Sequence, residues 1–183
     1  MQRKPHNTQL SDKPSTPNFV SVGIGTGVYT GNFNTAGGAQ RYTFIADASF
    51  GHWFNHASGV HAGISNSVVQ HWHKRHNQNL TAIHADYMLN IKSAVTGEPT
   101  EDQLFQLTGL AGVQMGISSE SGRKTRLAPA LNGAIQAGMR LSPSIEIYLE
   151  PSATIYTKKI EAAHSEHPAD GELRLSIGTK LHF

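Results

Sequence analysis

The chain has 183 residues, enough for one domain or for a small barrel with tails. Charged residues make up only 15%, and a formal net charge of +2 is too small to indicate a nucleic-acid partner. The chain contains no cysteine, which excludes a disulfide framework and a thiolate metal site. It also has no run of about 18 apolar residues, so the sequence predicts no transmembrane helix.

The first 18 residues are polar and contain several prolines. We expect them to form a flexible N-terminal segment, because they offer little apolar surface to bury. They do not read as an export signal, and we expect that any such signal was removed. Residues 19–183 then form a single domain.

Apolar and polar residues alternate along most of that domain, which predicts β-strands whose two faces differ. The clearest case is residues 126–141, where Leu127 and Leu131 share one face while Asn132 and Gln136 share the other. No segment shows a convincing helical period. The predicted strands are residues 19–29, 40–50, 59–70, 80–91, 104–118, 126–141, 145–157 and 171–183.

Two irregular features modify this pattern. Pro151 interrupts the seventh predicted strand, which we expect to accommodate it at a bulge. The connections also alternate: those after the odd-numbered strands are mostly polar, and those after the even-numbered strands are turn-like. Residues 94–102 are rather long for such a turn. With periplasmic termini, the polar connections would be extracellular.

An even set of about eight alternating strands predicts an antiparallel up-and-down barrel. In a transmembrane barrel the apolar face meets lipid and polar side chains fill the lumen, whereas a soluble barrel of the lipocalin type reverses this arrangement. The polar face here is mostly Gly, Ser, Ala and Thr with few charges. A water-facing surface usually carries many more long charged side chains. The sequence therefore favours the membrane barrel, and the soluble ligand-binding barrel remains an alternative.

The few charges on the polar face predict a paired network in the lumen, because an unpaired buried charge is costly. Within it we expect Glu150 to pair with Arg140 or Arg174. His84 and Asp86 share this face and could support acid–base chemistry. No serine or thiol stands out as their partner, which favours a hydrogen-bonded lumen network instead. The predicted charge network is Arg41, Asp47, Asp86, Arg140, Glu146, Glu150, Arg174 and Lys180.

Aromatic residues lie near the ends of the predicted strands, where membrane barrels carry interfacial girdles. The candidates are Phe19, Tyr29, Tyr42, Phe50, Trp53, Phe54, Phe105 and Phe183.

The last strand, with Leu181 and a terminal Phe183, resembles the C-terminal targeting signal that the barrel-assembly machinery reads in bacterial outer-membrane proteins. Three internal motifs are similar to the OmpA-like outer-membrane barrel domain of Bacteroidetes: FGHWFNHASGVHAG, HADYMLNI and RLSPSIEIYLE, at residues 50–63, 84–91 and 140–150. The resemblance covers about residues 40–183. It implies an integral eight-stranded barrel of the bacterial outer membrane with periplasmic termini. Many members continue into a peptidoglycan-binding domain, which we do not expect here because the sequence ends with the barrel.

Histidines cluster in two predicted loops, and imidazole suits Zn²⁺, Cu²⁺ or Ni²⁺. A polar loop rich in His, Lys and Arg is more typical of a solvated surface, so we expect no metal and no cofactor. The weak metal candidates are His71, His73 and His76, with His164 and His167 in the second loop.

From these observations we expect a non-enzymatic protein with a structural role, a surface-interaction role or a role as an accessory subunit of a larger outer-membrane complex. Lys74 and Arg75 are candidates for contacts to lipopolysaccharide phosphates. The main alternative is an outer-membrane enzyme that modifies lipids of the lipid A type. The fold alone does not distinguish these roles, because function in such folds resides in particular sites.

Overall fold

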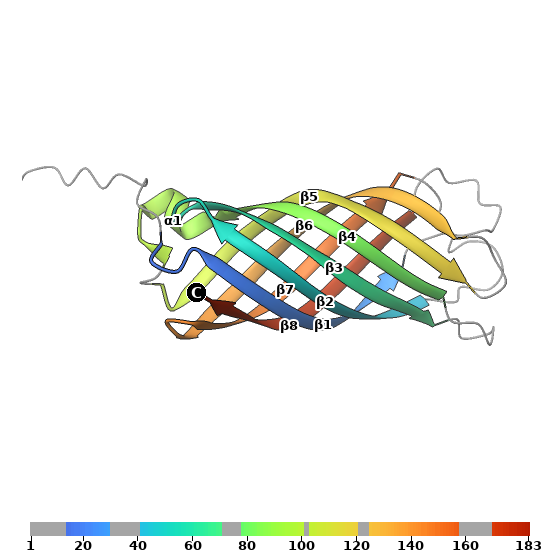
Figure 1. Ribbon diagram of the computed structural model, residues 1–183, viewed down its shortest axis with the longest axis horizontal. Coiled ribbons are helices and arrows are strands. Elements are labelled where there is room, and N and C mark those ends of the chain that lie inside the picture. The colour runs from blue at the N-terminus through green and yellow to red at the C-terminus, as the bar shows by residue number, and fades with distance from the viewer. Residues whose placement is uncertain (1–13, 30–40, 71–77, 101–102, 121–124, 158–169) are drawn as a thin grey trace, which may run out of the picture.

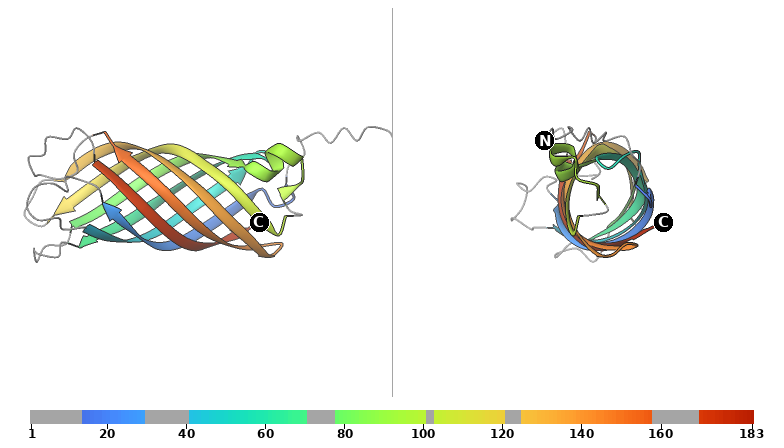
Figure 2. Two further views of the ribbon diagram at one scale, coloured as in Figure 1. Left: turned by 180° about the vertical axis from the view of Figure 1, so that it is seen from behind. Right: turned by 90° about the vertical axis from the view of Figure 1, so that its left-hand side faces the viewer.

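The structure is a computed structural model, and it describes residues 14–29, 41–70, 78–100, 103–120, 125–157 and 170–183. Eight antiparallel strands pair in sequence order, and β1 pairs with β8 to close the barrel (Figures 1 and 2). The predicted eight-stranded antiparallel barrel is confirmed. The strands are β1 Asn18–Tyr29, β2 Arg41–Trp53, β3 Ser58–Gln70, β4 Gln78–Asn90, β5 Phe105–Glu120, β6 Arg126–Ser142, β7 Ile145–Tyr156 and β8 Asp170–His182.

The β-ladders run along most of each strand without interruption, as in the β1–β8 pair that closes the barrel. The register shift of the β6–β7 pair lies between Arg140 and Ser142, next to the tight turn into β7. Pro151 keeps its register with Leu175 of β8, whereas its pairing with β6 is interrupted between Ser152 and Leu149 without a shift of register. The irregularity expected at Pro151 is therefore a local gap in the β6–β7 pairing and not a bulge. Pro151 is exposed on the outer face of the barrel.

The two faces of the barrel differ as the alternation predicts. Large apolar side chains cover the outside, where Ile24 is 67% exposed and Leu131 is 62% exposed. Polar side chains on the intervening residues point inward and are buried, among them Thr43, Gln114 and Glu146. This parity follows from the pleat, because successive residues of a strand point to opposite faces.

A short helix, α1 (Ile91–Thr96), joins β4 to β5 at the end of the barrel where the chain ends (Figure 1). Asn90 caps it, because its Oδ1 accepts a hydrogen bond from the Ser93 amide at 3.0 Å. Gly97 terminates it with a φ of 71° and donates its amide to the Ser93 carbonyl. The expectation of no helix is wrong here, since six residues are too few to show a helical period. None of the helices within the described residues is long and apolar enough to cross a membrane.

Two of the predicted girdle aromatics lie inside the barrel instead. Phe19 is 0% exposed and Trp53 is 1% exposed, and both pack with Met88 and Leu110. We call these four residues the proximal cluster, because they lie at the end that carries α1. Gly51 makes room for the Phe19 ring, which lies where a β-carbon would otherwise be. Of the other predicted girdle residues, the side chain of Tyr29 lies outside the described part of the chain. The remaining five are exposed: Tyr42, Phe50, Phe54, Phe105 and Phe183.

A second apolar cluster fills the lumen toward the opposite end. This distal cluster contains Leu80, Ala128, Ala130 and Tyr156. Leu80 is 1% exposed and Tyr156 is 0% exposed, so side chains pack the interior at both ends. A side-chain-filled interior is expected for a barrel of about eight strands.

Candidate functional site

A buried charge layer lies beside the proximal cluster. Lys180 Nζ is 2.9 Å from Glu146 Oε1, and His182 Nε2 is 3.1 Å from Glu146 Oε2. Glu146 and Lys180 face each other directly in the β7–β8 register, so the pleat brings both into the lumen. Lys180 Nζ also lies 5.1 Å from the centre of the Phe19 ring, within the range of a cation–π contact.

A second charge layer lies beside the distal cluster. Arg174 Nη2 donates to Glu172 Oε2 at 2.6 Å. The Tyr156 hydroxyl donates to the same oxygen at 3.3 Å, and Gln114 Nε2 donates to the Tyr156 hydroxyl oxygen at 2.8 Å. This layer ties β5, β7 and β8 together across the lumen.

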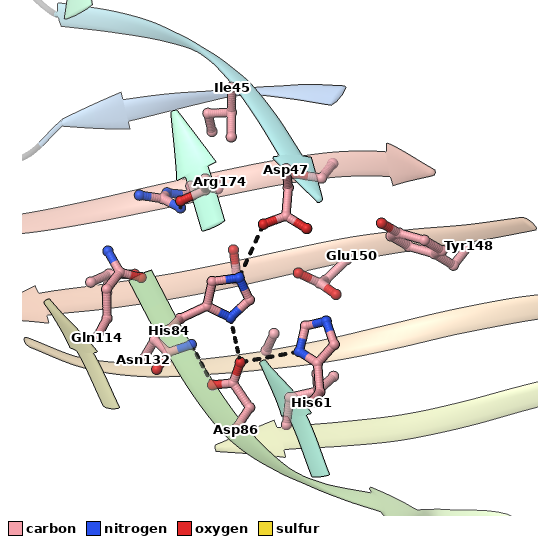
Figure 3. A pocket seen from close by; sticks show the side chains of 16 residues that line it. Ile45, Asp47, His61, His84, Asp86, Gln114, Asn132, Tyr148, Glu150 and Arg174 are labelled. Carbon is pink, nitrogen blue, oxygen red and sulfur yellow. Dashed lines mark hydrogen bonds and ion pairs between the residues drawn. The ribbon is translucent and has the colours of Figure 1, made fainter. Parts of the chain in front are cut away.

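Between the two layers lies a cavity of about 50 Å³, whose lining is shown in Figure 3. Asp86 is its central acceptor. Its Oδ2 is 2.8 Å from His84 Nδ1 and 3.2 Å from His61 Nδ1, and its Oδ1 accepts a hydrogen bond from Asn132 Nδ2 at 2.7 Å. His61 lies directly opposite Asp86 in the β3–β4 register, and His84 lies two residues away on the same face of β4.

The outer nitrogens of both imidazoles are also held. His84 Nε2 lies 3.1 Å from Asp47 Oδ2, and His61 Nε2 lies 2.7 Å from Ser49 Oγ. We call Asp47, His61, His84, Asp86 and Asn132 the central cluster. His61, His84 and Asp86 are each less than 9% exposed, so the hydrogen bonds form away from bulk water.

The structure changes two pairings that the sequence predicts. Glu150 Oε2 accepts a hydrogen bond from Gln136 Nε2 at 2.8 Å, whereas Arg174 pairs with Glu172. The expected pairing of Glu150 with Arg140 or Arg174 is therefore wrong among the described residues. Arg140 lies at the α1 end, where it lines a surface cleft with Gln103 and Pro143.

Several predicted positions lie outside the part of the chain that the structure describes. For Arg41 this applies to the side chain alone, because its backbone belongs to β2. The remaining positions are His71, His73, Lys74, Arg75, His76, His164 and His167.

Three buried members of the lumen network were missed from the sequence: His61, Glu172 and His182. The alternation of residues already points the side chains of His61 and His182 inward. They are absent from the predicted charge network because a histidine is not always charged. Glu172 immediately precedes the apolar alternation that begins at Leu173. Extending the period by one residue would have found it.

The central cluster also brings a serine to a histidine. Ser49 Oγ, His61 and Asp86 form a chain of hydrogen bonds at 2.7 and 3.2 Å, the order found in serine hydrolases. The expectation that no serine stands out is wrong in this respect. Ser49 also hydrogen-bonds Ser21. The adjoining cavity of about 50 Å³ is far smaller than the roughly 300–1,000 Å³ of typical ligand sites.

No protein-family model and no curated protein match the chain. Several solved structures do match it in fold. Neisserial surface protein A is 10% identical, with a TM-score of 0.65 over 91% of this chain and 97% of that chain. Ail of Yersinia pestis is 12% identical, with a TM-score of 0.59 over 93% of this chain and 100% of that chain.

The N-terminal β-barrel domain of OprF from Pseudomonas aeruginosa is 11% identical, with a TM-score of 0.55 over 92% of this chain and 98% of that chain. The chain shares the fold of all three. Ail has also been solved in complex with the heparin analogue sucrose octasulfate, and that structure is 14% identical with a TM-score of 0.56 over 91% of this chain and 99% of that chain. At such low identities the likeness shows the fold alone.

Proposed function

We propose that the protein is an integral β-barrel of the bacterial outer membrane with a non-enzymatic role in envelope structure or surface interaction. The observation that carries this is the apolar outer face, on which Val22, Leu127 and Leu173 are 63%, 62% and 57% exposed. Soluble monomers rarely expose a continuous apolar surface of this extent. Buried charge on the inside and apolar surface on the outside match a barrel with lipid around it.

We propose further that the end carrying α1 and the C-terminus faces the periplasm. Leu181 and Phe183 would then serve as the assembly signal, and both are exposed on the outer face. The Phe183 ring lies 6.5 Å from that of Phe50, so the two form a small aromatic patch near this end. On the sequence motifs alone, we propose that the OmpA-like barrels of Bacteroidetes are relatives of this protein.

For a surface role, the proposed contact region is the opposite end of the barrel, where β3 ends and β4 begins. Lys74 and Arg75 come between these two strands in the sequence. Cationic side chains there would suit the phosphates of lipopolysaccharide. The complex of Ail with a heparin analogue supports anionic saccharides as a class to test. Co-purification in mild detergent tests the other role, that of an accessory subunit.

The membrane proposal is tested by placing a charge at two depths. Ile24 lies midway along β1, whereas Ile145 begins β7 at the α1 end, and both are exposed. In lipid vesicles we expect Ile24→Arg to lower the free energy of unfolding by about 2–4 kcal/mol and Ile145→Arg by at most about 1 kcal/mol. On a soluble barrel both changes would stay within about 0.5 kcal/mol of neutral.

Fractionation gives an independent check. The wild-type protein should leave cell membranes with detergent but not with salt or carbonate. A folded protein that appears in the soluble fraction would overturn the proposal, and so would equal effects of Ile24→Arg and Ile145→Arg.

The Ser49–His61–Asp86 chain favours a lipid-modifying hydrolase as a second candidate. A fluorophosphonate probe distinguishes the two, since a hydrolase would be labelled at Ser49 and a Ser49→Ala variant would not. A lipid A mass profile that is unchanged on deletion of the gene would argue against this candidate. His61 and Asp86 are buried and the adjoining cavity is small, so we expect no labelling at Ser49.

A further inference from the structure

We propose that the central cluster is a binding site for a divalent transition-metal ion such as Zn²⁺, with His61, His84 and Asp86 as ligands. It differs from the predicted loop histidines, and it does not rest on the proposed function. A barrel without the ion would remain a membrane barrel.

The ligand atoms already converge. One ring nitrogen from each of His61 and His84 and a carboxylate oxygen of Asp86 all lie within 4.8 Å of one another. The Nδ1 atoms of His61 and His84 are 3.2 and 2.8 Å from the same Asp86 oxygen. Zinc bonds of about 2.0–2.1 Å in a tetrahedral arrangement separate neighbouring ligands by roughly 3.3 Å, which is close to both nitrogen–oxygen distances. Two imidazoles with one carboxylate form a donor set that suits Zn²⁺, Cu²⁺ or Ni²⁺ better than Mg²⁺ or Ca²⁺.

Each of the three proposed ligands makes a further hydrogen bond that fixes its orientation. The Nε2 atom of His84 is 3.1 Å from Asp47, and that of His61 is 2.7 Å from Ser49. Asn132 donates to the other oxygen of Asp86 at 2.7 Å. Metal-ligating histidines usually donate their remaining N–H to a carboxylate or another acceptor, which sets the tautomer and the ring orientation. The central cluster has this second layer on every ligand.

The contacts of the His84 ring also fit a metal ligand. Both ring nitrogens of His84 face a carboxylate, Asp86 on one side and Asp47 on the other. A neutral imidazole has one N–H, so it can donate to only one of them. With a metal ion on Nδ1, His84 would keep its proton on Nε2 and donate it to Asp47, which lies 3.1 Å away.

The charged residues that line the cavity also favour a bound cation. Among the described residues that line it, Asp47, Asp86 and Glu150 carry carboxylates, and Arg174 is the one guanidinium. Arg174 is already paired with Glu172, which is buried as well. Uncompensated buried negative charge is costly, and a divalent cation at His61, His84 and Asp86 would offset most of it.

The surroundings explain how such an ion would stay in place. A water molecule needs about 10–15 Å³, so the cavity of about 50 Å³ has room for the ion and a water as fourth ligand. The proximal and distal clusters lie on either side of it along the barrel. We therefore expect the ion to enter during folding and to exchange slowly afterwards.

The test uses the full chain refolded into lipid vesicles with Zn²⁺, washed with a chelator, and measured for bound zinc. The predicted loop candidates His71, His73, His76, His164 and His167 are replaced by Gln in all samples, so that they cannot contribute. We expect about one zinc per chain, and about a tenfold or greater loss in the Asp86→Asn and His61→Gln variants. His52→Gln is the matched control, since His52 bonds Asn18 at the α1 end, and it should retain zinc.

Two further readouts separate ligation from a merely structural effect. Asp47→Asn leaves all three ligands in place, and we expect it to weaken zinc affinity by about 10–100-fold. X-ray absorption of the protein carrying only the loop substitutions should show a nitrogen and oxygen shell at about 2.0–2.1 Å with scattering from two imidazoles. This second measurement remains decisive if a ligand variant fails to fold. The proposal is overturned if no zinc survives the chelator wash, if Asp86→Asn retains as much zinc as His52→Gln, or if the zinc shell contains no imidazole.

Discussion

The buried pair of Glu146 and Lys180 allows a sharp test of how charge is held inside the barrel. The side chains are 1% and 2% exposed, and the ion pair is 2.9 Å long. Glu146→Gln keeps the shape of the side chain but removes the charge that both Lys180 and His182 face. Breaking one side of such a pair costs about 3–5 kcal/mol, because the remaining charge is left buried without compensation. A typical domain has about 5–15 kcal/mol of stability in total, so the loss would be easy to measure.

The chain contains a matched control for this experiment. Lys92 and Glu98 form an ion pair of 2.7 Å beside α1, but their side chains are 45% and 35% exposed. Glu98→Gln should therefore change stability by at most about 1 kcal/mol. The assay is urea unfolding in lipid vesicles followed by tryptophan fluorescence, to which the buried Trp53 contributes. The reasoning is refuted if Glu146→Gln costs no more than Glu98→Gln, or if Glu146→Gln combined with Lys180→Met is no more stable than Glu146→Gln alone.

Two further predictions concern close packing and the helix cap. Gly178→Ala should destabilise the barrel by about 1–3 kcal/mol in the same unfolding assay, because a β-carbon there would overlap the Tyr148 phenol. Gly109→Ala is its control and should stay within about 0.5 kcal/mol, since the nearest atom to its added carbon is 4.0 Å away; equal effects of the two would contradict this account. Asn90→Ala should cost about 1 kcal/mol by removing the cap of α1. Faster amide hydrogen exchange at Ser93 would report the loss, and an unchanged rate would count against the cap.

The sequence predicts the barrel well because a strand with one apolar face leaves its period in the residues themselves. The predictions for single residues are wrong where they do not follow that period. Phe19 shares its parity with Ser21, and both are buried, yet its position at a strand end suggested an outward girdle. The second predicted strand ends at residue 50, whereas β2 continues to Trp53 and keeps it on the inward face.

The candidate site was harder to predict, because it depends on register. His84 and Asp86 are neighbours on one strand, so their proximity could be anticipated. The contact between His61 and Asp86 requires the β3–β4 pairing, which no local pattern of residues encodes. Asn132 reaches Asp86 from β6, across the lumen, and only the closed barrel brings them together. The same closure pairs Arg174 with Glu172 and leaves Glu150 to Gln136.

The packing of the lumen bears on what the barrel can do. Passage of a solute through the described barrel would have to displace Phe19 and Trp53 at one end and Tyr156 at the other, all of them fully buried. An opening would also have to separate Glu146 from Lys180, whose charges are paired at 2.9 Å in the buried interior. We therefore infer that this interior is built to keep its charges in place and not to conduct. Any binding by the barrel would then occur at its two ends, or at the central cluster, where carboxylates outnumber the guanidinium among the described residues.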